Sequence, residues 1–507
     1  MMKKKLSLAI AAVLLLSALF ASCASSGNEN ITTVPSAATT GETVITKAPE
    51  TNPLSEFYAN YEQDDIPEST NFDGAEFTIL CDEGQYPKSF ADDYTGDVIN
   101  TAVFTRREVV EERLKVKINV VKKTGAYAGM ADFTANLSAG AGEYDLVLSY
   151  NLTPASMAVQ GLICDIASTN GVNFSKPWWS STLTENIAIN GKIFFTADNS
   201  SWNNIRNMLG IFVNKNIFST YYKDMKIDDL YAKVKDGSWT MEEMFTLAQG
   251  VYDDYDMDQS ATAKDLYGLC TANSVWNEAW FYAAGFTTMR PDGQGGLELT
   301  LTDQSIVDFL DWFRSKFYSD DPNAGIMYRY DSSQYAMFKD SRAMMYLSAI
   351  SMVEQKLEFP FSVLPLPRYG ETQDRYYTHF SNTYDMYSIP AASHDREMSS
   401  VVLECLASEA YRRIGPAYFE VYLKFQNADD AGLAEMYDII RSSIVFDTGY
   451  LYGELFVSGD NPIYFVRRCL NNNDGYQNFA AKWTSALNSR YNQLWKKTVE
   501  KLNSIVN

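Results

Sequence analysis

Short apolar strands alternate with amphipathic helices between residues 75 and 150, and this alternation restricts the fold more than any other feature of the chain. Residues 75–81 (AEFTILC), 115–121 (KVKINVV) and 144–150 (YDLVLSY) have the composition of strands. Apolar residues recur at helical spacing in residues 97–114, between the first two strands, and around residues 133–137. A strand–helix–strand–helix–strand order requires right-handed crossovers and a mostly parallel sheet covered on both faces. We therefore expect an α/β fold.

The carboxyl end of the third strand is the first candidate for a ligand site. Ligands of open α/β sheets bind beyond the carboxyl ends of the strands. Ser149, Tyr150 and Asn151 stand at this position in the chain. We therefore predict that Tyr150 and Asn151 contact a ligand.

The length of the chain predicts more than one folded body. Its 507 residues exceed what one hydrophobic core usually holds, so two domains or two lobes are expected. Residues 205–350 carry mainly helical patterns, whereas strand character returns at residues 361–367 and around residues 384–389. The second half of the chain therefore indicates a more helical unit, followed by a return to strands.

The N-terminus has the pattern of an export signal. Lysines at positions 3–5 precede an apolar run, residues 6–20, that is too short to span a bilayer. Small residues at positions 21 and 22 followed by Cys23 resemble the lipobox of bacterial lipoproteins, in which the cysteine is acylated. We expect residues 1–23 to be a lipoprotein signal peptide and the protein to be lipid-anchored through Cys23 at the extracellular face of the cell membrane. An ordinary signal peptide with an incidental cysteine is the alternative.

The segment after Cys23 predicts a linker. Residues 24–72 are rich in Ser, Thr, Pro, Glu and Asn and contain few large apolar side chains. Such a segment buries too little surface to offset the loss of chain entropy on folding. We expect a disordered linker that holds the folded body away from the membrane.

The charge of the chain excludes one class of partner. Its 42 Lys and Arg residues against 64 Asp and Glu residues give a formal net charge of −22. A surface of this sign repels phosphate backbones and anionic lipid. We therefore expect no nucleic-acid partner, and a membrane link that is covalent.

Catalytic motifs are not found in the sequence. Only two histidines are present, His379 and His394, and neither lies in a recognisable motif. Phosphate-binding and dinucleotide-binding glycine patterns, G-x-S-x-G and H-E-x-x-H do not occur either. The cysteines after Cys23 are widely spaced and odd in number, so they predict buried thiols and no disulfide framework. We expect no enzymatic activity and no required cofactor, although a glycosidase would need only two carboxylates.

Seven short stretches resemble, in their order, the extracellular solute-binding proteins of bacterial ABC importers, of the family-1 type that includes maltose-binding protein. They are YDLVLSY (144–150), INGKIFF (189–195), FVNKNIF (212–218), GSWTMEEM (237–244), FYAAG (281–285), AMFKDSRAMMY (336–346) and FSVLPLPRY (361–369). The resemblance extends over residues 74–507 and rests on the order of the stretches, since each alone is weak.

The resemblance implies a two-lobed periplasmic-binding-protein-like fold of type II, in which interleaved lobes are joined by a hinge. Carried over to this chain, lobe one comprises residues 73–200 plus 361–405, and lobe two comprises residues 201–360 plus 406–507. Solute bound between the lobes favours a closed state that membrane permease subunits of the importer recognise. The implied protein is a monomer that performs no chemistry.

The resemblance also points to a carbohydrate and to residues that would contact it. A sugar has an apolar face, which suits aromatic rings, and a rim of hydroxyls, which suits carboxylates and amides. Besides Tyr150 and Asn151, the ligand-binding residues expected from the positions of the family pattern are Asp198, Trp202, Trp276, Glu278, Trp280 and Tyr346. The alternative is that one tryptophan of the stretch that contains Trp276 and Trp280 packs inside lobe two.

Residues 254–265 (DYDMDQSATAKD) carry a possible calcium loop. Acidic residues at positions 1, 3, 5 and 12 of the stretch, which are Asp254, Asp256, Asp258 and Asp265, match an EF-hand-like loop. The stretch departs from the pattern at Gln259, where glycine is usual, and at Asp265, which is shorter than the usual Glu. Both a structural calcium site and a solvated acidic loop remain open.

Three functions fit the sequence. The leading hypothesis is a lipid-anchored receptor for an oligosaccharide or sugar that serves an ABC importer. A receptor of the same fold for peptides or another solute, and a surface glycoside hydrolase, are the alternatives. The hydrolase would place two carboxyl groups about 5 to 10 Å apart across a cleft and would turn sugar over.

Overall fold

A computed structural model describes residues 61–198, 201–272, 275–292, 297–318, 325–329, 333–381, 383–419, 430–455, 461–471 and 482–505. The expected signal peptide, Cys23 and most of the expected linker lie outside the described residues. The chain divides into two units, Met1–Lys47 and Ala48–Asn507, and the described residues all belong to the second unit.

Lobe one is built on a four-stranded sheet with the order β12-β3-β1-β2. Its central strand β1 (Ala75–Asp82) pairs in parallel with β2 (Val116–Lys123) and with β3 (Leu146–Tyr150), and β12 (Asp385–Ser388) adds to β3 in the antiparallel direction. The helices of this lobe are α3 (Tyr86–Ser89), α4 (Val98–Leu114), α5 (Met130–Ala139), α6 (Thr153–Val159), α7 (Ser181–Ile187) and α15 (Arg396–Glu409). The expected parallel strand–helix alternation is present from β1 to β3.

Local sequence explains where the first long helix begins and ends. Asp97 accepts the backbone N–H groups of Ile99 and Asn100, both at 3.0 Å, and so caps the start of α4. Lys115 adopts a left-handed conformation with φ 49° and ends the helix, so that the chain turns directly into β2.

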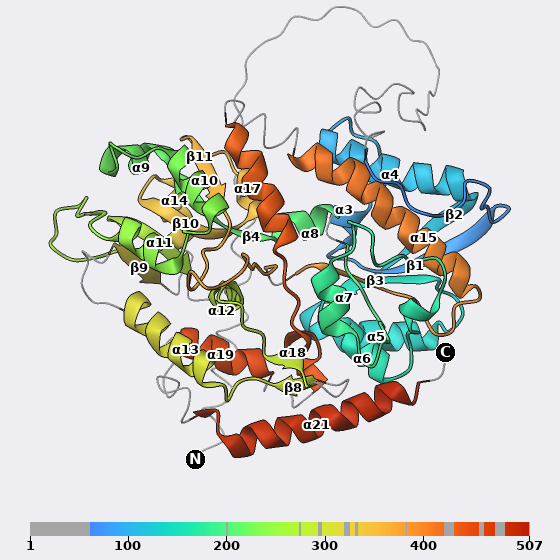
Figure 1. The fold of residues 1–507 in the computed structure, drawn as a ribbon. Coiled ribbons are helices and arrows are strands. Elements are labelled where there is room, and N and C mark those ends of the chain that lie inside the picture. Colours follow the sequence, from blue (N-terminus) through green and yellow to red (C-terminus); the bar gives the residue numbers. More distant parts are fainter. Residues whose placement is uncertain are drawn as a thin grey trace, which may run out of the picture. The chain divides into compact units, whose positions relative to one another are not determined.

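Two apolar layers cover the faces of this sheet. Ile79 and Cys81 of β1 belong to a cluster with residues of α4 and α15, whereas Leu80 between them faces the larger cluster that includes Phe133 of α5. Figure 1 shows α4 and α15 on one side of the strands and α5 and α6 on the other. Successive side chains of the strands therefore point to opposite faces of the sheet, and both faces are buried, as expected for a parallel sheet between helices.

Lobe two is built on a mixed sheet with the order β11-β4-β10-β6-β5, with β9 paired to β6. Its strands are β4 (Leu209–Asn214), β5 (Tyr252–Asp253), β6 (Leu266–Ala272), β9 (Ile326–Arg329), β10 (Ala343–Ala349) and β11 (Phe361–Leu364), and a separate hairpin contains β7 (Met289–Pro291) and β8 (Leu297–Leu299). The helices are α8 (Trp202–Asn207), α9 (Lys215–Tyr221), α10 (Ile227–Asp236), α11 (Met241–Ala248), α12 (Glu278–Ala283), α13 (Gln304–Phe317), α14 (Ser333–Lys339), α17 (Ala431–Ser442), α18 (Thr448–Leu451), α19 (Pro462–Leu470) and α21 (Ser485–Asn503).

The lobes are interleaved, but their boundaries differ from those expected. Strand β11 was expected in lobe one and instead pairs antiparallel with β4 of lobe two, so the chain returns to lobe one only after residue 364. A π-helical turn, Ala410–Ile414, packs against α4, so lobe one extends beyond residue 405. Strand pairing and helix packing, which sequence periodicity does not encode, decide these boundaries.

The last part of the expected linker is packed against lobe one. Arg113 donates to both carboxylate oxygens of Asp64, at 2.8 and 2.9 Å, and Ile66 and Phe72 pack on the apolar cluster that includes residues of α15. The expected end of the linker at residue 72 is therefore too late, because this segment forms specific contacts from Tyr61 onward.

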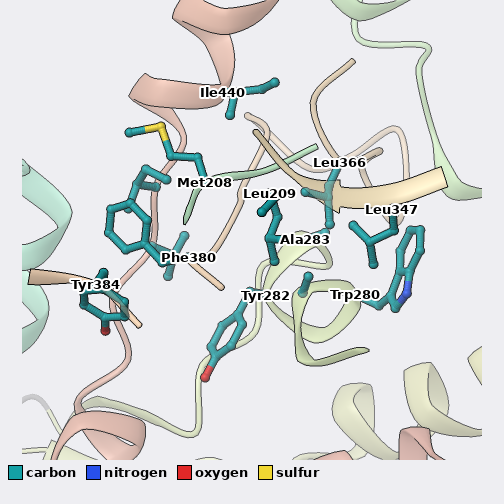
Figure 2. Close-up of a cluster of buried hydrophobic side chains, with 14 of the residues drawn as sticks. Met208, Leu209, Trp280, Tyr282, Ala283, Leu347, Leu366, Phe380, Tyr384 and Ile440 are labelled. Carbon is teal, nitrogen blue, oxygen red and sulfur yellow. The ribbon is translucent and has the colours of Figure 1, made fainter. Parts of the chain in front are cut away.

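A continuous buried cluster connects the two lobes. It includes Val147 and Tyr150 of lobe one, Phe380 and Tyr384 of the connecting segment, and Trp280 of lobe two. Figure 2 shows part of it, with Trp280 beside Leu347 and with Tyr282 and Tyr384 at its edge. Among the residues described, no helix combines the length and apolar character needed to cross a bilayer.

Candidate functional site

The carboxyl end of β3 presents two of the expected ligand-binding residues. Tyr150 is the last residue of β3 and Asn151 follows it, and each is 1% exposed. Their neighbour is Tyr384, which directly precedes β12, since Asp385 pairs with Tyr150 in the sheet register. The predicted edge of the parallel sheet is therefore formed by aromatic and amide side chains.

Lobe two brings three helices to this edge. The side-chain amide of Asn151 donates a 3.1 Å hydrogen bond to the Tyr450 hydroxyl on α18. We name the group around this contact the interlobe cluster. Its members are Tyr150, Asn151, Glu278, Tyr282, Tyr384, Asp447, Tyr450 and Arg467.

The charged members of the cluster are buried and have partners. Glu278 at the start of α12 is 3% exposed and forms an ion pair with Arg467 of α19. Burial raises the pKa of Glu278, and the positive charge of Arg467 opposes this shift. The pair thus places one acceptor and one donor group of lobe two beside the tyrosines.

Asp447 anchors the loop that carries Tyr450. Its Oδ2 accepts from the Tyr282 hydroxyl at 3.2 Å and from the backbone N–H and hydroxyl of Thr288 at 2.9 and 2.8 Å. Its Oδ1 accepts the N–H of Gly449 at 3.0 Å and caps α18. Burial raises the pKa of Asp447, and these hydrogen bonds lower it. The carboxylate therefore holds α12 and α18 in a fixed relation.

The tyrosine hydroxyls of the cluster stay protonated. Burial raises the pKa of Tyr150, Tyr384 and Tyr450 above the ordinary value. Figure 2 shows the hydroxyl ends of Tyr282 and Tyr384 directed away from the apolar cluster behind them. The rings offer flat apolar faces, and the polar ends offer hydrogen bonds at their rims.

His379 completes the packing behind the tyrosines. Its ring lies 4.3 Å from that of Tyr282, and its Nδ1 lies 3.3 Å from the carbonyl oxygen of Val445. Because a carbonyl oxygen only accepts, Nδ1 carries the proton. Burial lowers the pKa of His379 to about 4, so the ring is neutral at neutral pH.

The other expected ligand-binding residues lie elsewhere. Trp280 is fully buried in lobe two against Phe313 and Phe317, and Tyr346 of β10 packs 5.4 Å from Phe338. Trp276 is half-buried on the turn that leads into α12. The structure therefore brings Tyr150, Asn151 and Glu278 together, but places Trp280 and Tyr346 in the core of lobe two.

Asp198 and Trp202 lie at the first crossing between the lobes. The chain beside Asp198 bridges to Trp179, and its carboxylate accepts the N–H of Ser201. Trp202 begins α8, and its ring lies 5.4 Å from the Arg206 guanidinium. Both side chains lie where the chain passes into lobe two, and there Asn203 of α8 also donates to Asp385 of lobe one at 2.8 Å. Burial raises the pKa of Asp385 to about 6.

Sequence reasoning missed several members of the cluster. Asp447, Tyr450 and Arg467 come from the last 70 residues, and the one signal in the sequence was the aromatic stretch 445–453 (VFDTGYLYG), which contains Asp447 and Tyr450. Asp82, which lies at the carboxyl end of β1 and outside the cluster, was also not predicted, although the rule that selected Tyr150 applies to it as well. It is 1% exposed, its Oδ2 has no hydrogen-bond partner among the described residues, and burial raises its pKa.

Three of the four expected metal ligands lie together. Carboxylate oxygens of Asp254, Asp256 and Asp265 are within 4.8 Å of one another, and Asp258 is not part of this group. A hollow of about 350 Å³ lies elsewhere on lobe two, between α10, α17 and the segment around Arg368. None of the expected ligand-binding or metal residues lines this hollow.

Comparisons with known proteins support the fold. No protein-family model matches the chain, and no curated protein matches it in sequence. Solved structures match with high probability. A cyclo/maltodextrin-binding protein complexed with maltotetraose is 14% identical, with a TM-score of 0.50, over 88% of this chain and 100% of that chain.

Two further solved structures match in the same way. The GacH receptor of Streptomyces glaucescens, solved unliganded and with acarbose, is 12% identical with a TM-score of 0.50, over 83% of this chain and 99% of that chain. The cyclic α-maltosyl-1,6-maltose-binding protein of Arthrobacter globiformis is 12% identical with a TM-score of 0.51, over 84% and 99%. The chain therefore has the expected two-lobed α/β fold, similar to that of maltodextrin-binding proteins.

Proposed function

We propose that the protein is an extracellular solute-binding protein that holds a sugar or oligosaccharide at the interlobe cluster. The contact between Asn151 of lobe one and Tyr450 of lobe two carries this proposal, because it joins an amide of lobe one to a tyrosine of lobe two. Lobe two also brings the carboxylates of Glu278 and Asp447 to this cluster. Aromatic faces beside hydrogen-bonding rims are the chemistry that recognises a carbohydrate.

The fold supports the same proposal. The similar proteins with a TM-score of at least 0.5 are a cyclo/maltodextrin-binding protein complexed with maltotetraose, a receptor complexed with acarbose, and a cyclic α-maltosyl-1,6-maltose-binding protein. A solute bound between the two lobes would then favour the closed arrangement of the lobes over the open one. The solute would be released unaltered.

The two buried carboxylates of the cluster favour binding over hydrolysis. Glu278 is paired with Arg467, and Asp447 accepts hydrogen bonds from Tyr282, Thr288 and Gly449. A glycosidase needs one carboxyl group free to give a proton and a second free to attack or to activate water. Both groups instead have partners that hold them in place.

The proposal extends to the cellular role. The protein would act as a monomer with the permease subunits of an ABC importer, without a nucleic-acid partner or a required cofactor. Acylation of Cys23 would anchor it at the extracellular face of the cell membrane. Mass spectrometry of the protein purified from its native membrane tests the anchor, since an acylated Cys23 at the mature N-terminus is expected and an unmodified one would contradict it.

A thermal-shift screen against a glycan panel tests the function. A sugar at 100 times its dissociation constant adds about 2.7 kcal/mol to the free energy of unfolding and raises the melting temperature. Chromatography of the same incubations should show the sugar unchanged. A response to peptides alone would support the same-fold alternative, and release of shorter sugars would support a glycosidase.

A further inference from the structure

The acidic loop between β5 and β6 carries an arrangement that the proposed function does not use. Strand β5 pairs antiparallel with the start of β6 at the edge of the lobe-two sheet. The loop between them presents carboxylate oxygens of Asp254, Asp256 and Asp265 within 4.8 Å of one another. Mutual repulsion opposes such a grouping, and a cation among the three carboxylates would relieve it.

Asp265 supplies an independent indication of a ligand. Its side chain is 0% exposed. Its Oδ2 accepts the N–H of Thr262 at 2.7 Å and lies 3.5 Å from the Tyr252 hydroxyl, whereas its Oδ1 has no hydrogen-bond partner among the described residues. A buried carboxylate oxygen without a partner is costly. A cation held jointly with Asp254 and Asp256 would remove that cost.

The loop backbone has the form that such a site needs. Both oxygens of Asp254 are oriented by backbone N–H groups, from Asp258 at 3.2 Å and from Gln259 at 2.9 Å. Gln259, where the sequence lacks the usual glycine, has φ 62° and takes the left-handed conformation that glycine would take. The sequence departure at Gln259 therefore does not prevent the sharp turn.

The donor set suits calcium. Calcium is held by six to eight oxygens at about 2.3 to 2.6 Å in flexible geometry, whereas magnesium requires near-ideal octahedral geometry at about 2.0 to 2.1 Å and keeps several of its waters. Three carboxylates on one loop supply oxygen ligands only, as calcium prefers. Lys264 lies 2.9 Å from Asp256, but its side chain is 73% exposed and leaves the buried oxygen of Asp265 uncompensated.

We propose that this loop binds one calcium ion through Asp254, Asp256 and Asp265. The ion would fasten the loop to the edge of the lobe-two sheet, because Asp265 immediately precedes β6 and Asp254 immediately follows β5. Water and backbone carbonyl oxygens would complete its coordination. The site is distinct from the interlobe cluster, and its role is to stabilise lobe two.

Calcium and terbium titrations of the full mature chain, after treatment with chelator, test the site. Terbium emission excited through Tyr252 should appear, and calcium should displace it with a stoichiometry of one ion per chain. Calcium should also raise the melting temperature more than an equal concentration of magnesium does. Absence of both effects at millimolar calcium would overturn the proposal.

Matched variants assign the ligands. Asp254→Asn and Asp265→Asn should each weaken calcium binding about tenfold or more, because even outer partners of metal sites are worth 10- to 100-fold in affinity. Asp253→Asn makes the same charge change at an exposed neighbour outside the group and should leave binding intact. If Asp265→Asn does not fold, the comparison of Asp254→Asn with Asp253→Asn still tests the assignment, since Asp254 is partly exposed. Equal behaviour of Asp254→Asn and Asp253→Asn would contradict the assignment.

Discussion

Asn151 and Tyr450, 299 positions apart in the chain, are joined by a 3.1 Å hydrogen bond from the Asn151 amide to the Tyr450 hydroxyl. The bond connects the carboxyl end of a lobe-one strand to a helix of lobe two. The side-chain carbonyl oxygen of Asn151, Oδ1, has no hydrogen-bond partner among the described residues. A polyhydroxylated solute would supply donors and acceptors at this point.

Removing the Tyr450 hydroxyl should weaken solute binding. Tyr450→Phe keeps the ring and leaves the Asn151 amide without its partner, which costs about 1 to 3 kcal/mol. We expect the affinity for the sugar found in the screen to fall about tenfold, as measured by calorimetry. Tyr452→Phe is the control, because its buried ring packs on Phe195 and Trp495 outside the cluster. Equal losses in both variants would contradict the role of Tyr450.

Breaking the Glu278–Arg467 pair should destabilise the fold. Glu278→Gln leaves the Arg467 guanidinium, 22% exposed, without its negative partner. Loss of one partner of a buried pair is strongly destabilising, and we expect about 2 kcal/mol or more in urea denaturation. Glu242→Gln removes a more exposed pair with Lys316 and should cost less than about 1 kcal/mol. A smaller loss of unfolding free energy in Glu278→Gln than in Glu242→Gln would contradict a stabilising ion pair between Glu278 and Arg467.

The His379 ring should stay neutral at pH values well below 6.5, the ordinary pKa of histidine. Its folded pKa of about 4 lies below the ordinary value of 6.5, so the unfolded chain binds a proton between these values and the folded chain does not. His379 therefore stabilises the fold fully above pH 6.5, and this contribution falls by up to about 1.4 kcal/mol per pH unit as the pH drops towards 4.

Proton NMR measures this directly, because the chain contains only His379 and His394. The His379 ring signals should remain constant from pH 8 to about 5.5, since the folded pKa is about 4, and His394→Gln assigns them. A His379 titration midpoint near 6.5, the ordinary value, would contradict burial of the ring.

Two glycines with left-handed backbones should differ sharply in their tolerance of a side chain. A Cβ on Gly325 (φ +70°) would lie 1.6 Å from the backbone carbonyl oxygen of Ala248, whereas one on Gly161 (φ +71°) would meet nothing within 4 Å. Gly161→Ala should cost about 1 kcal/mol from conformation alone. Gly325→Ala should cost roughly 2 to 4 kcal/mol in denaturant unfolding, because the backbone must also move. Similar losses of unfolding free energy in the two variants would contradict this prediction and would show that the backbone of α11 moves easily at Ala248.

The sequence predicted best where local periodicity is strong. The segment from β1 to β3 alternates strands and helices as expected, and Tyr150 and Asn151 lie at the carboxyl end of β3 as expected, whereas their contact with a ligand stays a prediction. Sheet membership of β11 could not be predicted, because a short strand pattern fits either sheet and only pairing with β4 decides between them.

Helical geometry separates Glu278 from Trp280. Residues two apart on a helix point to different sides, whereas residues four apart share a face. Glu278 and Tyr282 accordingly belong to the cluster, and Trp280 packs into the core against Phe317. The packing of Trp280 in the core corresponds to the alternative considered for a tryptophan of this stretch. Arg467 could not be inferred at all, because its partner Glu278 lies 189 positions away.

Hydrogen–deuterium exchange with and without the bound sugar tests the central claim most directly. If the solute sits between the lobes at the interlobe cluster, peptides containing Tyr150 and Asn151 and peptides containing Asp447 and Tyr450 should both exchange more slowly when it is present. Protection confined to one lobe, or found only around Arg368 and the surface hollow, would contradict the proposed site.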